Sequence, residues 1–346
     1  MDELFLKEVK NDINKIIYEM KRCKSKSRYY QLSVDLDCLY SMCEFLNISD
    51  IPLLENHSYR NSLDQYNKKN VTRVIDDLVS NYQYYLKISS MGTKLINKFY
   101  LTRDLKYRYM LETYFSEQDS FLLACDFLKE YNPNVLSSFI DVVKNNRALI
   151  GTFAFDNEYG TTFCITETEF PYLLVNSKKN ISLPFTYVHE SGHIYNLLKY
   201  KNSSYKIIDR NNIEGIFLEV YSNFLELVFV DYLNKNNLYS KDVNLIKKEF
   251  DLDLAKKLEV FHNMIKEDLQ RFDINYYKML LLNIFGKVIA YHYYDMYLTD
   301  PEKTNHDLEQ FMINNGSYSN IEVLDMFGLS SEKLVDSKIL EKHFSK

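Results

Sequence analysis

The run His189-Glu190-Ser191-Gly192-His193 fits the pattern H-E-x-x-H. On a helix, residues four apart lie on one face, so the two imidazoles can bind one metal ion. Glu190 lies about 100° further round the helix axis, where its carboxylate can reach a water at the open coordination position. The run therefore predicts a helix over about 183–200 that holds one zinc ion, with His189 and His193 as ligands and Glu190 as general base.

The alternative interpretation of this run is an amphipathic helix with two surface histidines. The chain has only 7 His among its 346 residues. A chance match to the pattern is expected in about one of 100 chains of this length and composition. The metal site is therefore the leading interpretation.

A catalytic zinc ion usually takes a third protein ligand. The segment 216–230 is apolar on nearly every side, which predicts a buried helix. Its polar residues Glu219, Ser222 and Glu226 form one stripe. Buried carboxylates are costly unless a cation or donors satisfy them, so we expect Glu219 to be the third ligand. We expect Ser222 and Glu226 to orient the histidines. Glu214, about 140° round the helix from Glu219, is the second choice for the third ligand. The alternative interpretation of the helix is that its polar stripe merely faces solvent.

Local patterns predict a mainly helical protein with a small antiparallel-type β-sheet beside the active-site helix. Only 8 Gly and 5 Pro interrupt the chain, so long helices are expected. The chain changes character near Arg147, which suggests an N-terminal helical region, 1–146, and a zinc-binding catalytic region, 147–346, in one continuous unit with a cleft. Strands are expected at 148–155, 161–166 and 171–176. Further helices are expected at 4–20, 31–46, 71–88, 93–116, 118–131, 134–145, 212–234, 242–270, 275–298, 304–314 and 331–343.

Charge and cysteine content narrow the possible partners and location. The net charge of −6 disfavours nucleic acid and anionic membrane surfaces as partners. The five cysteines are odd in number and contain no C-x-x-C, which predicts reduced thiols in a cytoplasmic protein. Neither a signal-peptide layout nor an apolar stretch long enough to cross a membrane is present in the sequence.

Several segments resemble one family, the thimet oligopeptidase and oligoendopeptidase F group of zinc metallopeptidases. The run 189–193 resembles its H-E-x-G-H form, and 219–226 is similar to its E-x-x-S-x-F-x-E segment. The strand at 171–176 resembles the one before its metal helix, and 311–317 with 324–329 resemble its closing segments. The resemblance covers about 120–335. It implies a zincin fold of the gluzincin type, one zinc ion and endopeptidase action on short or unfolded peptides.

The chain departs from this family in two ways. Family members are considerably longer, so the channel that restricts them to short peptides is expected to be altered here. The family also has a segment rich in His and Tyr that stabilises the tetrahedral intermediate. In register, its Tyr positions fall near Met279, Leu281 and Asn283, and its His near Asp273.

Nearby side chains are candidates to replace these missing donors. Tyr276, Tyr277 and His292 are the leading candidates for stabilising the oxyanion, followed by the neighbouring Tyr291, Tyr293 and Tyr294. A structural role is the alternative for each.

Three functions are consistent with these patterns. The leading hypothesis is a zinc peptidase that acts on peptide substrates, with the strand at 171–176 pairing with the substrate backbone. The altered Tyr region motivates the second, a metal-bearing peptide-binding protein that has lost turnover. The shorter N-terminal region motivates the third, a processing protease dedicated to one partner peptide.

Overall fold

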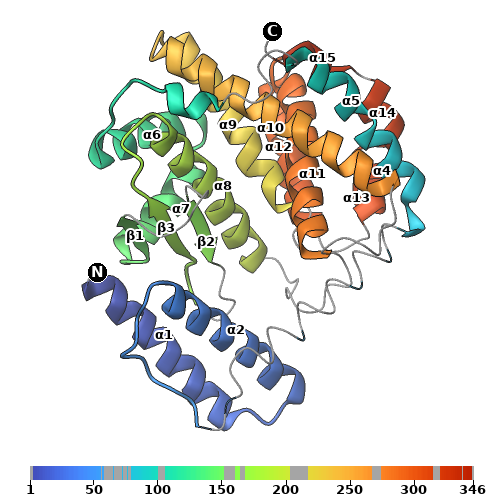
Figure 1. Ribbon diagram of the computed structural model, residues 1–346. Coiled ribbons are helices and arrows are strands. Elements are labelled where there is room, and N and C mark those ends of the chain that lie inside the picture. Colours follow the sequence, from blue (N-terminus) through green and yellow to red (C-terminus); the bar gives the residue numbers. More distant parts are fainter. Residues whose placement is uncertain are drawn as a thin grey trace.

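The computed structural model shows helices arranged around a small sheet (Figure 1). It describes residues 3–55, 57, 65, 72, 76, 79–99, 106–151, 160–163, 168–202, 217–266, 274–314, 320–336 and 338–344.

Two antiparallel helices, α1 (Glu3–Arg22) and α2 (Lys26–Phe45), lie at the N-terminal end of the chain (blue in Figure 1). The buried residues of α1, which include Val9, Ile13 and Ile16, recur at the three- and four-residue spacing of one helix face. Both N-terminal helices are therefore confirmed, and α2 begins five residues before the predicted start.

The sheet has three strands in the order β1-β3-β2, with β1 at Ala148–Gly151, β2 at Gly160–Phe163 and β3 at Tyr172–Asn176. β2 pairs with β3 antiparallel, but β1 pairs with β3 parallel. The expected antiparallel-type sheet is therefore wrong for one of its two pairings. After β1 the chain forms β2 on the far side of β3 and returns through the centre, so β1 and β3 run in the same direction.

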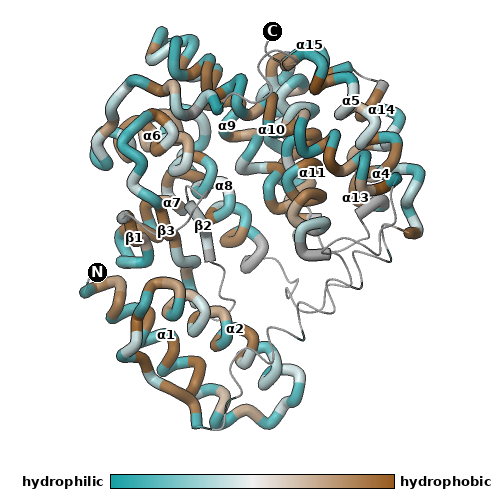
Figure 2. Tube along the Cα trace, in the orientation of Figure 1, coloured by the Kyte–Doolittle hydropathy of each residue, from teal (hydrophilic) through white to brown (hydrophobic). Residues whose placement is uncertain are grey.

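The central strand β3 is buried on both faces. Tyr172 and Leu174 contact the hydrophobic cluster formed by α1 and α2, whereas Leu173 and Val175 belong to the large core of the remaining helices. Successive side chains of a strand point to opposite faces, so one strand joins both clusters. This double burial explains the continuous hydrophobic run at 173–175, visible in Figure 2.

A buried polar cluster ties α1 to the sheet. Arg147 Nη1 donates to Asp12 Oδ2 at 2.5 Å, and the Tyr172 hydroxyl donates to the same oxygen at 2.5 Å. Removing one partner of a buried ion pair leaves an uncompensated charge. We expect Asp12→Ala to lower the free energy of unfolding by about 3–5 kcal/mol in urea titrations. Asp50→Ala, at an exposed ion pair with Lys10, is expected to leave the free energy of unfolding nearly unchanged, and equal losses would contradict this assignment.

A single large hydrophobic core joins the remaining helices to the sheet. In it α8 packs against α6, α7 and α9, and α11 packs against α9. The division into two regions at 146/147 stays a prediction. The helices are α4 (Tyr82–Ser89), α5 (Met91–Ile96), α6 (Glu117–Tyr131), α7 (Pro133–Lys144), α8 (Ser182–Asn202), α9 (Leu218–Lys235), α10 (Ser240–Lys266), α11 (Ile274–Tyr297), α12 (Pro301–Asn314), α13 (Asn320–Met326), α14 (Ser331–Asp336) and α15 (Ile339–His343), with two 3₁₀ turns, η1 (Asn97–Phe99) and η2 (Tyr107–Met110).

The predicted helix over 93–116 is wrong beyond its first turns. The α-helix α5 ends at Ile96 and is followed by the 3₁₀ turn η1, and from Leu111 the chain runs non-helically to the start of α6. The backbone N–H groups of Glu112 and Thr113 donate to the Asp242 carboxylate, at 3.3 and 2.8 Å. Because these donors are satisfied from another helix, this part of the chain does not need helical hydrogen bonds.

The described helices include none that is both long enough and apolar enough to cross a membrane.

Candidate metal centre

Helix α8 directs both histidines of the H-E-x-x-H run toward one cavity. Most of its residues are buried, but His189, His193 and Leu197 are partly exposed at i, i+4 and i+8. The side-chain oxygen of Asn180 accepts the N–H of Ser182 at 2.9 Å and so satisfies a free donor at the start of the helix. The cavity that this stripe faces has a volume of about 620 Å³.

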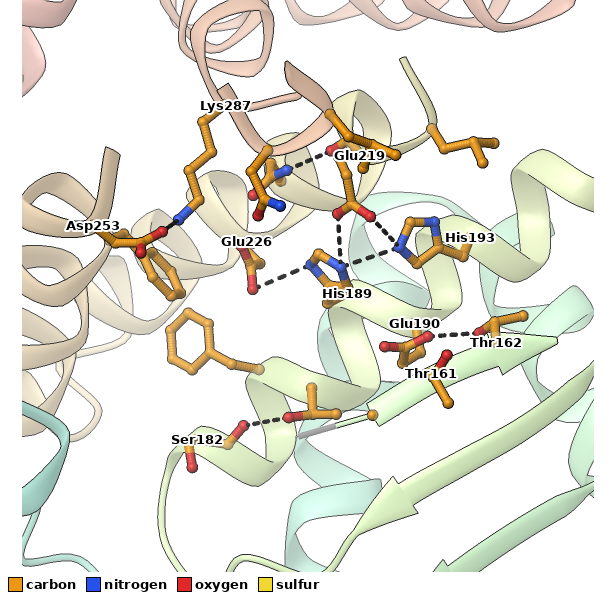
Figure 3. Close-up of a pocket in the computed structure, with 18 of the residues that line it drawn as sticks. Thr161, Thr162, Ser182, His189, Glu190, His193, Glu219, Glu226, Asp253 and Lys287 are labelled. Carbon is orange, nitrogen blue, oxygen red and sulfur yellow. Dashed lines mark hydrogen bonds and ion pairs between the residues drawn. The ribbon is translucent and has the colours of Figure 1, made fainter. Parts of the chain in front are cut away.

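Helix α9 brings a carboxylate to the two imidazoles. It is buried on nearly all sides, as its sequence predicts, and Glu219 and Glu226 are among its few partly exposed residues. Glu219 Oε2 lies 3.2 Å from His189 Nε2, and Glu219 Oε1 lies 3.5 Å from His193 Nε2. The two Nε2 atoms lie 3.1 Å apart (Figure 3). The three side chains thus form a triangle in which each Nε2 atom faces a different oxygen of the Glu219 carboxylate, and one potential ligand atom of each residue lies within 4.8 Å of the other two.

This triangle fits a zinc ion. Tetrahedral zinc with ligand distances of about 2.0–2.2 Å separates its ligand atoms by about 3.3 Å. The two Nε2 atoms lie 3.1 Å apart and each lies 3.2 or 3.5 Å from the carboxylate oxygen that faces it, which is close to this value. Two imidazoles and one carboxylate form a common catalytic zinc ligand set. These three residues are also the ones that the described chain brings together as a potential metal-binding group.

The electrostatics of this triangle favours positive charge. Burial lowers the pKa of His189, but Glu226 and Glu219 outweigh burial and raise that pKa well above its ordinary value. Burial raises the pKa of Glu219, but His193 and His189 bring it down to about 2. Glu226 contributes from the second ring nitrogen, since its Oε1 lies 3.3 Å from His189 Nδ1. A carboxylate at Nδ1 orients the ring so that Nε2 faces the triangle.

Glu190 lies beside this triangle and is held by the sheet. The Thr162 hydroxyl of β2 donates to Glu190 Oε2 at 2.6 Å, and the Glu190 residue is only 4% exposed. Both residues line the cavity (Figure 3). β2 is an edge strand that lines this cavity, whereas β3 is central. The expectation that 171–176 pairs with a substrate is therefore wrong, because both its sides are already paired.

Two glycines set the spacing of the helices that carry the ligands. A Cβ atom on Gly192 would lie 2.7 Å from Ser222 Oγ, so α8 and α9 approach closely at this point. A Cβ atom on Gly286 of α11 would lie 2.3 Å from the Cβ atom of Glu219. Ser222 thus packs against Gly192, and its buried hydroxyl has no hydrogen-bond partner among the described residues. It therefore forms no hydrogen bond to either histidine, contrary to the expectation that it orients them.

Gly286→Ala is expected to displace the Glu219 side chain. Overpacking costs about 1–3 kcal/mol of stability, and we expect zinc affinity to fall about tenfold as the carboxylate moves. Gly92→Ala is the matched control, because its Cβ atom would lie 2.4 Å from the backbone of Glu259, between α5 and α10. It is expected to cost similar stability in thermal unfolding and to leave zinc affinity unchanged. Equal affinity losses would show that Gly286 has no specific role at the metal centre.

The structure does not bring Tyr276, Tyr277 or His292 to this cavity. Tyr276 is 50% exposed, and Tyr277 is buried against Phe261, with ring centroids 5.3 Å apart. His292 is buried beside Tyr293, and burial together with Lys333 lowers its pKa to about 4. None of the three lines the cavity, so their placement does not support the expected role as oxyanion donors.

The neighbouring tyrosines are also engaged elsewhere. The hydroxyl of Tyr291 donates to Asp251, and that of Tyr294 donates to Asp231 at 2.8 Å. Tyr293 is buried against Phe311. Glu214, the second choice for the third ligand, lies outside the described residues.

Other cavity residues were not expected from the sequence. Met279 and Asn283, at two of the positions where the resemblance places Tyr, line the cavity, whereas Leu281, at the third, does not. The cavity also contains Asp253, Lys257 and Lys287. One signal for Lys287 was available, since it is a charged residue in the otherwise apolar middle of α11.

Comparison with known proteins gives no match at the level of sequence families. No protein-family model matches the chain, and no curated protein matches it. Solved structures do match. A protein from Bacillus anthracis strain Ames assigned as oligoendopeptidase F is similar at 12% identity and a TM-score of 0.50, covering 91% of this chain and 62% of that protein.

Two further structures are similar to the same extent. Another protein assigned as oligoendopeptidase F has 13% identity and a TM-score of 0.50, covering 90% of this chain and 64% of that one. PZ peptidase A, solved with an inhibitor, has 10% identity and a TM-score of 0.51, covering 91% and 64%. This chain thus spans less than two thirds of the length of these proteins. The resemblance to oligoendopeptidase F inferred from the sequence motifs is confirmed at the level of the fold.

Proposed function

We propose that this chain is a zinc-dependent metallopeptidase of the zincin, gluzincin-like type that hydrolyses peptide bonds in short or unfolded peptides. The observation that carries the proposal is the approach of His189 Nε2 and His193 Nε2 to within 3.1 Å of each other and to within 3.2 and 3.5 Å of the two Glu219 carboxylate oxygens, beside Glu190. The similarity to peptidase structures in fold adds support.

His189, His193 and Glu219 would hold the zinc ion. A zinc ion bound there supplies a Lewis acid that polarises the scissile carbonyl and lowers the pKa of water to about 7. Glu190 takes a proton from the attacking water and passes it to the nitrogen of the departing amine. The Thr162 hydroxyl fixes Glu190 Oε2, which leaves Oε1 to carry the proton. Glu226 keeps His189 Nε2 directed at the triangle.

The edge strand β2 offers a position for the substrate backbone. It pairs only with β3 among the described strands, and its Gly160, Thr161 and Thr162 line the cavity. An extended peptide can add to such an edge through main-chain hydrogen bonds, which read little of the side-chain sequence. This favours action on peptides of varied sequence.

The test is incubation of the zinc-loaded protein with a diverse pool of short peptides, with products read by mass spectrometry. Glu190→Gln serves as the control for contaminating proteases. Cleavage by the wild type alone would support the proposal. Stoichiometric zinc binding without any cleavage would overturn it and favour a peptide-binding protein, for which the absence of Tyr at 279 and 283 is the motivating observation.

A further inference from the structure

A second charged group lies in the same cavity, apart from the metal-binding triangle. Lys287 Nζ of α11 lies 2.7 Å from Asp253 Oδ2 of α10, and Lys257 Nζ lies 2.9 Å from the same oxygen. Lys257 also donates to the Asn283 side-chain oxygen at 3.0 Å. In Figure 3 the Lys287–Asp253 pair lies away from His189, with Glu226 drawn between them.

The second charged group (Lys257, Lys287 and Asp253) has two ammonium groups for one carboxylate, and it has more N–H donors than its own contacts use. Asp253 is the carboxylate that contacts both ammonium groups, while Glu226 and Glu219 add negative charge nearby without an ion pair to either lysine in the described structure. The two lysines have six N–H donors in total, and three contacts within the described residues use three of them. The remaining donors belong to side chains that line the cavity.

Both ammonium groups are partly withdrawn from water. The side chain of Lys287 is 14% exposed and that of Lys257 is 28% exposed. Burial and the nearby Lys287 lower the pKa of Lys257, while Asp253 only partly offsets them. Burial lowers the pKa of Lys287 as well, but Asp253, together with Glu226 and Glu219, outweighs it and raises that pKa. A desolvated ammonium group that shares its contacting carboxylate with a second one is stabilised by a further bound anion.

The group also lies along one wall of the cavity. Met279, Asn283 and Lys287 occupy i, i+4 and i+8 of α11, and all three line the cavity. A peptide that reaches the triangle along this wall therefore passes the two ammonium groups. Phe250 lies against them, with Lys287 Nζ 5.5 Å from its ring centroid. The low-dielectric ring strengthens an ion pair formed at this position.

We propose that Lys257 and Lys287 bind a carboxylate of the peptide substrate, so that the preferred substrates are peptides with an anionic group at a fixed distance from the cleaved bond. The inference rests on the proposed function, because it names the substrate class of the same cavity. The carboxylate is either the C-terminus of a short peptide or an acidic side chain. A charge-assisted hydrogen bond to such a group corresponds to about a 10- to 100-fold gain in affinity.

The test measures binding separately from cleavage. Fluorescent peptides of one neutral sequence are titrated by anisotropy into the Glu190→Gln protein, as the free acid, as the C-terminal amide, and as amides with one Asp at each position in turn. We expect one carboxylate-bearing form to bind about 10- to 100-fold more tightly than the plain amide. Preference for the free acid identifies the C-terminus as the source, and preference for one Asp position identifies a side chain. Equal binding of all forms would overturn the inference.

Lysine variants in the same background link this preference to the site. Lys257→Gln and Lys287→Gln are each expected to remove most of it, while Lys256→Gln, on the same helix but outside the cavity lining, is expected to retain it. If Lys287→Gln fails to fold, the binding preference of Lys257→Gln alone tests the assignment. A preference that survives both substitutions would overturn the assignment.

The same peptides then go to the zinc-loaded protein with Glu190 intact. Cleavage with equal KM for the acid and amide forms would support the proposed peptidase and overturn the carboxylate site. Lysine-dependent binding of carboxylates without cleavage would support the carboxylate site and overturn the proposed peptidase.

Discussion

Glu190→Gln is expected to lower kcat about 10²- to 10⁴-fold while the protein keeps one zinc ion per chain. Glutamine has almost the shape of glutamate, and its side-chain oxygen can still accept the hydrogen bond from Thr162. It cannot take a proton from the attacking water. Rates are measured on a peptide selected from the pool, and zinc is measured by atomic emission on the same preparation.

Thr162→Val provides the matched test of how Glu190 is held. The valine keeps the shape of β2 but removes the donor to Glu190 Oε2, so we expect a loss in kcat of about tenfold. Thr161→Val, one residue earlier on the same strand, is expected to have a smaller effect, because no hydrogen bond from Thr161 to Glu190 is formed in the described structure. If Glu190→Gln kept kcat within tenfold of the wild type, another group would have to be the base.

The proximity of the three candidate ligands was the most predictable part of this chain, because metal binding requires fixed residue types at fixed spacings. His189 and His193 must lie one helical turn apart to share an ion. Glu219 could be inferred because a carboxylate in an apolar helix needs a cation. The structure brings these three side chains together although Glu219 lies 26 residues beyond His193.

The same reasoning could not find the second charged group. Lys287 breaks an apolar helix as Glu219 does, but its partner Asp253 lies 34 residues earlier on another helix. Nothing in the local pattern shows which two helices pack together. The direction of β1 relative to β3 could not be predicted from the sequence either. Side chains alternate with a period of two in both parallel and antiparallel pairs, so the pattern does not show which pairing forms.

The positions of the expected oxyanion donors show that residues close in sequence on one helix can face different sides of it. Tyr277 lies two residues before Met279, which places it about 200° round the axis of α11, and it faces Phe261. His292 lies five residues after Lys287, about 140° round the axis. Met279 and Asn283 line the cavity, but these two expected donors lie on other faces of α11.

The two glutamates of α9 are expected to differ in their effect on zinc affinity. Glu219 lies within 3.5 Å of both Nε2 atoms, whereas Glu226 approaches only His189 Nδ1, at 3.3 Å. Glu226→Gln should therefore weaken zinc binding about 10- to 100-fold, as the loss of a residue that orients a ligand does. Glu219→Gln should weaken it more than about 100-fold, because a ligand itself is lost. Competition with a chelating dye measures both.

Thermal unfolding gives an independent reading of the same difference. Zinc at about 100 times its Kd stabilises a folded protein by about 2.7 kcal/mol, so the Tm of the wild type should rise when zinc is added. At that zinc concentration the increase should shrink in Glu226→Gln and disappear in Glu219→Gln. The opposite ranking in both measurements would make Glu226 the third ligand. Glu219 and Glu226 are seven residues apart, about 10.5 Å along the helix axis and about 20° round it, so Glu226 could take the place of Glu219 only if α9 shifted by about two turns along its axis. Because Gly286 packs directly against the Cβ atom of Glu219, such a shift would have to displace α11 as well.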